Sequence, residues 1–217
     1  QPVMAHASYL INLGSPDDAL HTRSRVALGE ELDRAETLGL LGVVLHPGSY
    51  TTTTEEAGLA RIADGIVAVL NERTDQHTRL LLEHTAGQGT NLGHTFQQLG
   101  TIIDDAEARG TTSIGVCLDT CHLLAAGYDL GSAESYADTM AQLEQHVGLD
   151  RVKAIHLNDS KTPLGSRVDR HTHIGSGHVG LGAFRRLLTD PRMQAVPMVL
   201  ETPKERSANP AAIEAGI

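Results

Sequence analysis

Short apolar segments in this sequence end, one after another, in a histidine, an aspartate or a glutamate. The residues at or just beyond these ends are His6, His46, Glu83, Asp119, His122, His156 and Glu201, and a glycine-rich segment, residues 166–182, adds Asp169 and His171. Imidazole nitrogen and carboxylate oxygen, without thiolate, are typical ligands of zinc or manganese in catalytic rather than structural sites. The recurrence of these residue types at successive segment ends therefore predicts a metal site.

The size of this set indicates more than one metal ion. Five histidines and four acidic residues are too many ligands for a single ion, and they suit two or three ions with one carboxylate shared by a pair. Neighbouring divalent ions are a common solution for phosphoryl displacement, because they activate the attacking water and stabilise the leaving oxygen. A lone histidine at a strand end is more often a core or capping residue, but the repetition at every segment end argues against that interpretation here.

The apolar segments have the length and composition of buried β-strands. They cover residues 3–10, 40–46, 79–85, 114–120, 153–159 and 197–202. Amphipathic stretches of helical period lie between them, at residues 25–39, 58–73, 92–110, 134–148 and 181–190. Capping residues within 15–18 and 131–135 indicate helix starts, and Gly39, Gly110 and Gly148 indicate helix ends. This alternation of strand and helix predicts a parallel sheet covered by helices.

Two architectures are compatible with six such units. One is a closed (β/α)8 barrel, which needs eight units and about 250 residues, and the other is a doubly wound open sheet. The strand ends of a barrel open on one face, whereas those of an open sheet spread along an edge. Because the polar set converges only in the barrel, we expect an α/β fold of the (β/α)8 TIM type, truncated to about six units, with residues 1–217 as a single barrel domain.

Composition limits the compartment and the partners. The formal net charge of −10 argues against a generic basic groove for DNA, but bound divalent ions can invert the polarity of a site. Cys117 and Cys121 are the only cysteines and cannot form a secreted disulfide framework, so we expect a reduced, cytoplasmic protein. No apolar run approaches the roughly 18 residues of a membrane span, and we expect a monomer.

Several motifs resemble one known family. HASYLINLG at residues 6–14, GVCLDTCH at 115–122, and IHLNDSK with DRHTHIGSG between 155 and 177 are similar to the three signatures of the endonuclease IV family, the family 2 AP endonucleases of the xylose-isomerase-like barrel superfamily. Further matches in family order are LHPGS at 45–49, EHTAGQGTNLG at 83–93 and LETP at 200–203. The resemblance covers essentially the whole chain, and each signature is long enough to make a chance match to all of them negligible.

The resemblance implies three zinc ions, with Mn²⁺ as an alternative in one position. The first would take His6, His46 and Glu83; the second Glu83, Asp119, His156 and Glu201; the third His122, Asp169 and His171. Glu83 would bridge two ions and place the hydroxide nucleophile. The implied reaction is hydrolysis of the phosphodiester on the 5′ side of an abasic site in double-stranded DNA, leaving a 3′-hydroxyl and a 5′-deoxyribose phosphate, together with the removal of 3′-blocking groups.

The resemblance also suggests DNA contacts and shows departures. Tyr9 matches a residue that enters the DNA near the lesion, and Lys161, Arg167 and Arg170 are candidate phosphate contacts that could equally be solvated charges. The family carries additional strands before the first signature. His84 stands where the family usually has asparagine, and Val168 stands where a basic residue usually precedes the metal-binding aspartate.

Two other functions remain open at this point. A divalent-metal sugar isomerase or epimerase uses the same kind of barrel, but it needs fewer ligands and lacks the pair formed here by Asp169 and His171. The non-catalytic alternative is a DNA- or metal-binding barrel, or an inactive metal-binding fragment of an active parent. Loss of Glu83 or Asp119 would have supported the non-catalytic barrel, and both residues are present; the sequence does not separate the inactive fragment from a competent enzyme.

Overall fold

A curled, six-stranded parallel sheet forms the centre of the molecule. The computed structural model of the chain describes residues 2–202. In the sheet the strands follow the order β1 (Ala5–His6), β2 (Gly42–Leu45), β3 (Arg79–Glu83), β4 (Ile114–Asp119), β5 (Val152–His156) and β8 (Met198–Val199), each parallel to its neighbours. The short strands β6 (Asp159–Ser160) and β7 (His171–Thr172) form a separate antiparallel pair. The six predicted strands are therefore confirmed, as is their parallel arrangement.

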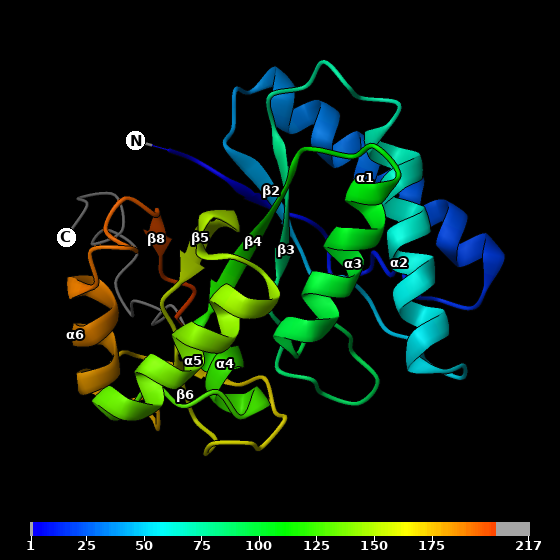
Figure 1. The fold of residues 1–217 in the computed structure, drawn as a ribbon. Coiled ribbons are helices and arrows are strands. Elements are labelled where there is room, and N and C mark those ends of the chain that lie inside the picture. The colour runs from blue at the N-terminus through cyan, green and yellow to red at the C-terminus, as the bar shows by residue number, and fades with distance from the viewer. Residues whose placement is uncertain (1, 203–217) are drawn as a thin grey trace, which may run out of the picture.

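Helices connect the strands and cover the outer face of the sheet (Figure 1). They are α1 (Asp18–Thr37), α2 (Glu55–Leu70), α3 (Phe96–Ala108), α4 (Thr120–Ala126), α5 (Ala133–His146) and α6 (Leu181–Thr189), with a 3-10 turn at Leu149–Arg151. The predicted caps are present: Asp17 accepts a hydrogen bond from the amide of Leu20, and Ser132 forms a reciprocal capping box with Ser135. None of the helices within residues 2–202 combines the length and the apolar character needed to cross a membrane.

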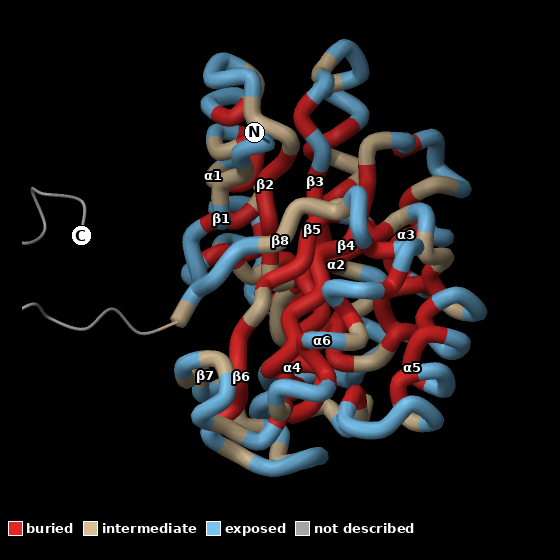
Figure 2. Tube along the Cα trace, turned by 90° about the vertical axis from the view of Figure 1, so that its left-hand side faces the viewer, coloured by how far each residue is buried: buried red, intermediate tan, exposed pale blue. Residues whose placement is uncertain are grey.

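Side chains of the central strands alternate between two apolar clusters. Val43, Leu80, Val116 and Ile155 belong to the large core between the sheet and the helices, which is the buried interior seen in Figure 2. Val44, Leu81, Cys117 and Ala154 form a smaller cluster on the inner face of the sheet, with Met4 packed against it. Because successive strand residues point to opposite faces, the residues two positions later also point inward: His6, His46, Glu83, Asp119 and His156.

The sheet curls far enough for its first and last strands to approach each other. Residues Pro2 to His6 and Val199 to Glu201 line one open cavity of about 300 Å³, together with Val44 and His156 from the inner face. Among the described residues, 2–202, β1 pairs only with β2, and β8 pairs only with β5. The observed fold is thus a partial TIM-type barrel of six strands, as the sequence predicts.

Candidate metal centre

Glu83 lies at the centre of the polar residues that the inner face brings together. Its side chain is buried, and its two carboxylate oxygens face different partners. Oε2 lies 3.0 Å from Nε2 of both His6 and His46. Oε1 lies 3.0 Å from Nδ1 of His156 and 3.4 Å from Nδ1 of His122. Burial by itself raises the pKa of this carboxyl, but the four surrounding imidazoles outweigh it, and the pKa lies well below its usual value.

A second set of ligand atoms surrounds the Oε1 side of Glu83. Nδ1 of His156 lies 3.0 Å from Oε2 of Glu201 and 3.9 Å from Oδ2 of Asp119. One ligand atom each from Glu83, Asp119, His156 and Glu201 lies within 4.8 Å of all the others, and the same holds for His6, His46 and Glu83. Glu83 therefore belongs to two groups, one on each of its oxygens, which is the geometry of a carboxylate able to bridge two ions.

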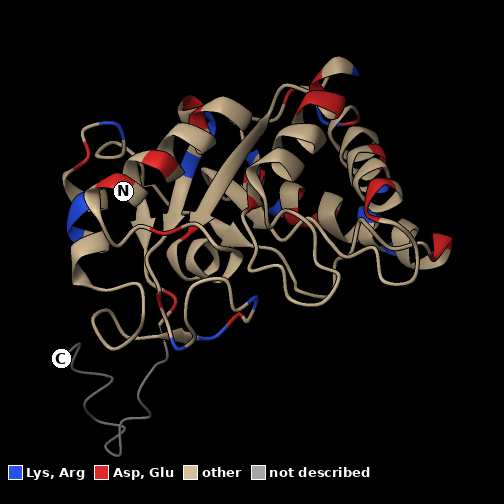
Figure 3. Ribbon diagram, turned by 60° about the horizontal axis from the view of Figure 1, so that its bottom comes forward, with Lys and Arg blue, Asp and Glu red and all other residues tan. Residues whose placement is uncertain are grey.

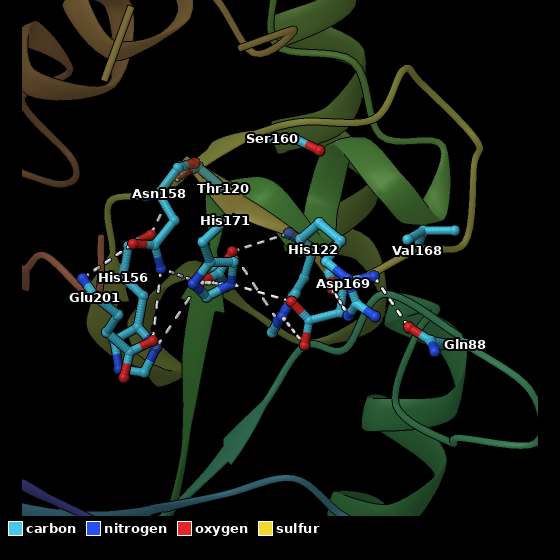
Figure 4. Close-up of polar contacts among 12 residues, drawn as sticks. Gln88, Thr120, His122, His156, Asn158, Ser160, Val168, Asp169, His171 and Glu201 are labelled. Carbon is cyan, nitrogen blue, oxygen red and sulfur yellow. Dashed lines mark hydrogen bonds and ion pairs between the residues drawn. The ribbon is translucent and has the colours of Figure 1, made fainter. Parts of the chain in front are cut away.

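A third group lies beside the second and consists of His122, Asp169 and His171. His122 Nε2 is 3.2 Å from Asp169 Oδ2, and His171 Nε2 is 3.2 Å from Asp169 Oδ1. Figure 4 shows His122 with Asp169 on one side of His171 and His156 with Glu201 on the other. All nine residues predicted as ligands therefore lie in three adjoining groups.

Two buried imidazole nitrogens of the third group face one carboxylate in a way that suits a cation. Nε2 of His122 and Nε2 of His171 each lie 3.2 Å from Asp169, yet within the described residues neither makes a hydrogen bond of good geometry. Nδ1 of His122 lies 2.9 Å from the carbonyl oxygen of His84. Because a carbonyl oxygen can only accept, Nδ1 carries a proton in this contact, and Nε2, which faces Asp169, is the ring nitrogen that a cation would bind. His6 is arranged in the same way, with Nδ1 2.8 Å from the carbonyl oxygen of Ala7.

Asp119 has two roles at the end of β4. Its Oδ1 accepts a hydrogen bond from the amide of His122 at 2.9 Å, which caps α4, and its Oδ2 accepts one from the side-chain amide of Asn158 at 2.6 Å. Asn158 is itself buried, and its Oδ1 accepts the backbone N–H of Glu201 at 2.9 Å. Asn158 thus holds the carboxylate of Asp119 and the backbone of Glu201, two residues of the second group. The sequence analysis did not predict this role, although Asn158 lies in the motif IHLNDSK, two residues after the predicted ligand His156.

Gln88 is a second residue that the sequence analysis did not single out. It lies in the loop after β3, and its Oε1 accepts the backbone N–H of Asp169 at 3.2 Å (Figure 4). This contact ties the segment that carries the third group to the loop that follows Glu83. Gln88 is exposed, so only the three-dimensional arrangement reveals its role.

The cysteines are packing residues. Cys117 belongs to the inner apolar cluster, and burial raises the pKa of its thiol to about 12, which keeps it protonated. Cys121 is also buried, and its sulfur lies near Asp119 and His171. Burial raises the pKa of the Cys121 thiol as well. Since the thiolate is the form that ligates metals, the imidazoles and carboxylates are the better donors.

The predicted DNA contacts are exposed at the same end of the sheet as the three groups. Tyr9 follows β1 and is 89% exposed. Lys161, Arg167 and Arg170 are exposed in the segment between β6 and β7. Other Lys and Arg residues are scattered over the molecule rather than gathered into one basic stripe (Figure 3). Positive charge at this end would therefore have to come largely from bound cations.

His84 and Val168, the two departures from the family pattern, lie close to this centre. His84 is fully buried and packs on Phe96 and Tyr128 at ring-centroid distances of 5.2 and 5.3 Å. Burial lowers its pKa to about 3, so its ring is neutral. Val168 is half-buried, and its carbonyl oxygen accepts a hydrogen bond from Thr162. Neither side chain lies in any of the three groups.

Comparison with known proteins gives a consistent assignment. Residues 2–217 match the family described as xylose isomerase-like TIM barrel. A protein of Chloroflexus aurantiacus named "Probable endonuclease 4" is 50% identical over 94% of this chain and 70% of its own length. A protein of the same name from Trichlorobacter lovleyi is 47% identical over 93% and 71%. The crystal structure of endonuclease IV from Thermus thermophilus superimposes with a TM-score of 0.80 at 38% identity, covering 94% of this chain and 70% of that one.

More distant structures share the fold alone. An L-ribulose 3-epimerase superimposes with a TM-score of 0.70 at 18% sequence identity, over all of this chain and 67% of that one. The much higher identity to the proteins named endonuclease separates the two groups. The chain therefore belongs to the endonuclease IV family of xylose isomerase-like TIM barrels.

Proposed function

We propose that this chain is a zinc-dependent endonuclease that hydrolyses the phosphodiester on the 5′ side of abasic sites in double-stranded DNA. The products would be a 3′-hydroxyl and a 5′-deoxyribose phosphate, and the same site would remove 3′-blocking groups. The observation that carries the proposal is the arrangement around Glu83, whose two oxygens face two separate ligand groups with a third group alongside. Membership of the endonuclease IV family supports it.

Three metal positions follow from the three groups. His6, His46 and Glu83 would hold the first ion, Glu83, Asp119, His156 and Glu201 the second, and His122, Asp169 and His171 the third. Nitrogen and oxygen donors without thiolate favour zinc, with Mn²⁺ as an alternative in one position. Bound divalent ions supply an activated water nucleophile near neutral pH and stabilise charge on the leaving oxygen.

The residues of the chain would hold and orient the reacting groups. Glu83 would fix the spacing of the first two positions, since one rigid carboxylate serves both. Asn158 would keep Asp119 and Glu201 in place through hydrogen bonds to both residues. Tyr9 would enter the DNA at the lesion, and Lys161, Arg167 and Arg170 would contact phosphates. An abasic nucleotide costs least to turn out of the helix because no base is stacked there.

We also propose the partner, the oligomeric state and the compartment of the chain. The partner would be damaged double-stranded DNA, and the chain would act as a monomer in the cytoplasm. A sugar epimerase on the same fold would need fewer ligands, so the third group, in which the His122 and His171 nitrogens converge on Asp169, favours the nuclease.

Incision of a labelled duplex carrying one abasic-site analogue tests the proposal. We expect a single cut on the 5′ side of the lesion, a 3′ end that a polymerase extends, and no cut in the undamaged duplex. Chelation should abolish incision, and zinc should restore it. The proposal is wrong if the folded, zinc-loaded chain leaves the damaged duplex intact, and epimerisation of a ketose by that chain would favour the alternative.

A further inference from the structure

Asp159 is a buried carboxylate that lies next to the metal centre without belonging to any of its groups. It is fully buried at the start of β6. Within residues 2–202 it forms no ion pair with a basic side chain. Burying a carboxylate is costly unless hydrogen bonds compensate for the lost water. This cost indicates that the carboxylate has a specific role.

Backbone amides of the glycine-rich segment surround this carboxylate. Its Oδ2 accepts hydrogen bonds from the N–H groups of Gly175 at 2.9 Å and Gly177 at 3.1 Å. Its Oδ1 accepts from Val179 at 2.9 Å and from Ser160 at 2.9 Å. Hydrogen bonds to a charged acceptor are about twice as strong as those between neutral groups. The turn between residues 175 and 179 is therefore wrapped around one anion.

The sequence of this turn depends on the same contact. Gly175 has a φ of 83°, which favours glycine. A Cβ at Gly177 would lie 2.5 Å from Asp159 Oδ1 and would collide with the carbonyl oxygen of Ser160. Val179 at the end of the turn is buried in the large core, and the Asp159 carboxylate holds the glycine backbone that precedes it.

The turn is directly connected to the third ligand group. β7 pairs with β6 in the register Asp159 with Thr172 and Ser160 with His171. The chain thus leaves β6, returns with Asp169 and His171, and then folds around the side chain of Asp159. β7 contributes only two residues to its ladder, which is too short to hold the segment alone. The carboxylate anchors the side of this segment that follows His171.

We propose that Asp159 is the positioning residue of the third metal site: its carboxylate gathers the backbone of residues 175–179 and thereby keeps Asp169 and His171 opposite His122. This inference rests on the proposed function for the ion that the group would hold. The ligands of the first two groups come from other strands. Removing the Asp159 charge should therefore affect the third site selectively.

Asp159→Asn in the full chain tests this inference, because asparagine has the same size but offers only one acceptor oxygen. We expect the zinc-loaded variant to retain one ion fewer than the wild-type chain, with an unchanged far-UV circular dichroism spectrum. Hydrogen exchange provides a readout that is independent of metal. The amides of Gly175, Gly177 and Val179 should exchange roughly tenfold faster or more, while those of β3 and β4 stay protected.

Asp190→Asn is the matched control. Asp190 is also a buried aspartate that accepts a backbone N–H, from Arg192 at 3.0 Å, but it ends α6. Its other partners are the Arg192 guanidinium and the Tyr136 hydroxyl, and neither residue belongs to the metal centre. This variant should lose stability and keep all its ions. Gly177→Ala perturbs the same contact by placing a Cβ against the Asp159 carboxylate. This variant should reproduce the Asp159→Asn result.

Two results would overturn the inference. One is a folded Asp159→Asn chain with wild-type zinc content and unchanged exchange in residues 175–179. The other is uniform loss of every ion together with global loss of protection. If the wild-type chain itself bound no third ion, the proposed metal centre would fail, and the exchange measurement would still decide whether Asp159 holds the turn.

Discussion

Replacement of Glu83 by glutamine should weaken metal binding at the first two positions and leave the third position intact. Glutamine has the size of glutamate, so the packing around this buried residue is preserved, but the charge is lost and one oxygen becomes an NH₂ group. That group would face either the His6 and His46 nitrogens, 3.0 Å from Oε2, or His156, 3.0 Å from Oε1. In either orientation one group loses its carboxylate, and the other retains only a neutral carbonyl.

The expected magnitude follows from the double role of Glu83. Loss of a group that only orients a metal ligand typically costs about 10–100-fold in metal affinity. Because Glu83 would itself be a ligand at both positions, we expect a loss of roughly 100-fold or more in affinity there. The third group, which lacks Glu83, should keep its ion.

Competition with a chelator of known affinity, followed by metal analysis of the protein, measures this change. Glu36→Gln is the control for the substitution itself, since Glu36 lies at the end of α1 and binds the backbone amides of His77 and Thr78. A Glu83→Gln chain that holds zinc as tightly as the Glu36→Gln chain would refute the bridging role.

Three other predictions concern DNA contact, the core and pH. Tyr9→Ala should weaken binding to an abasic duplex in a titration while changing the free energy of unfolding by less than about 0.5 kcal/mol, since Tyr9 is 89% exposed; equal affinity for DNA would remove Tyr9 from the interface. Leu82→Ala, in the fully buried outer face of β3, should lower the free energy of unfolding in urea by about 2–5 kcal/mol. A smaller loss would mean that neighbouring core side chains fill the space left by Leu82. Hydrogen bonds from Thr78 and His77 lower the pKa of Glu36 from 4.5 to about 2, so Glu36→Gln should destabilise the chain above pH 4.5, and the difference from wild type should shrink as the pH falls from 4.5 toward 2. A difference that does not depend on pH would contradict this assignment.

Much of the centre could be predicted because its residues follow the inner face of the strands. Val44, Leu81 and Cys117 point inward, so the residues two positions later point inward too. Since these positions fall at the carboxyl ends of parallel strands, the sequence alone predicted which side chains would meet. The helix ends could also be predicted, because glycine is the residue that most easily adopts the positive φ angles found at Gly110 and Gly148 after α3 and α5.

Other parts of the fold could not be seen in the sequence. β6 and β7 contribute two residues each to their ladder, which is too short for an alternating pattern to be detected. The helix α4 was missed because its N-cap, Asp119, had been interpreted only as a ligand. The side-chain contacts of Asn158 and Asp159 depend on segments far away in the sequence.

Anomalous X-ray scattering at the zinc edge, from crystals of the zinc-loaded chain, would locate the ions themselves. We predict three peaks: two flanking the Glu83 carboxylate, one on the side of His6 and His46 and one on the side of His156, and a third between His122, Asp169 and His171. A single peak, or a set of peaks that leaves either Glu83 or the Asp169 and His171 pair without an ion, would contradict the three-ion centre.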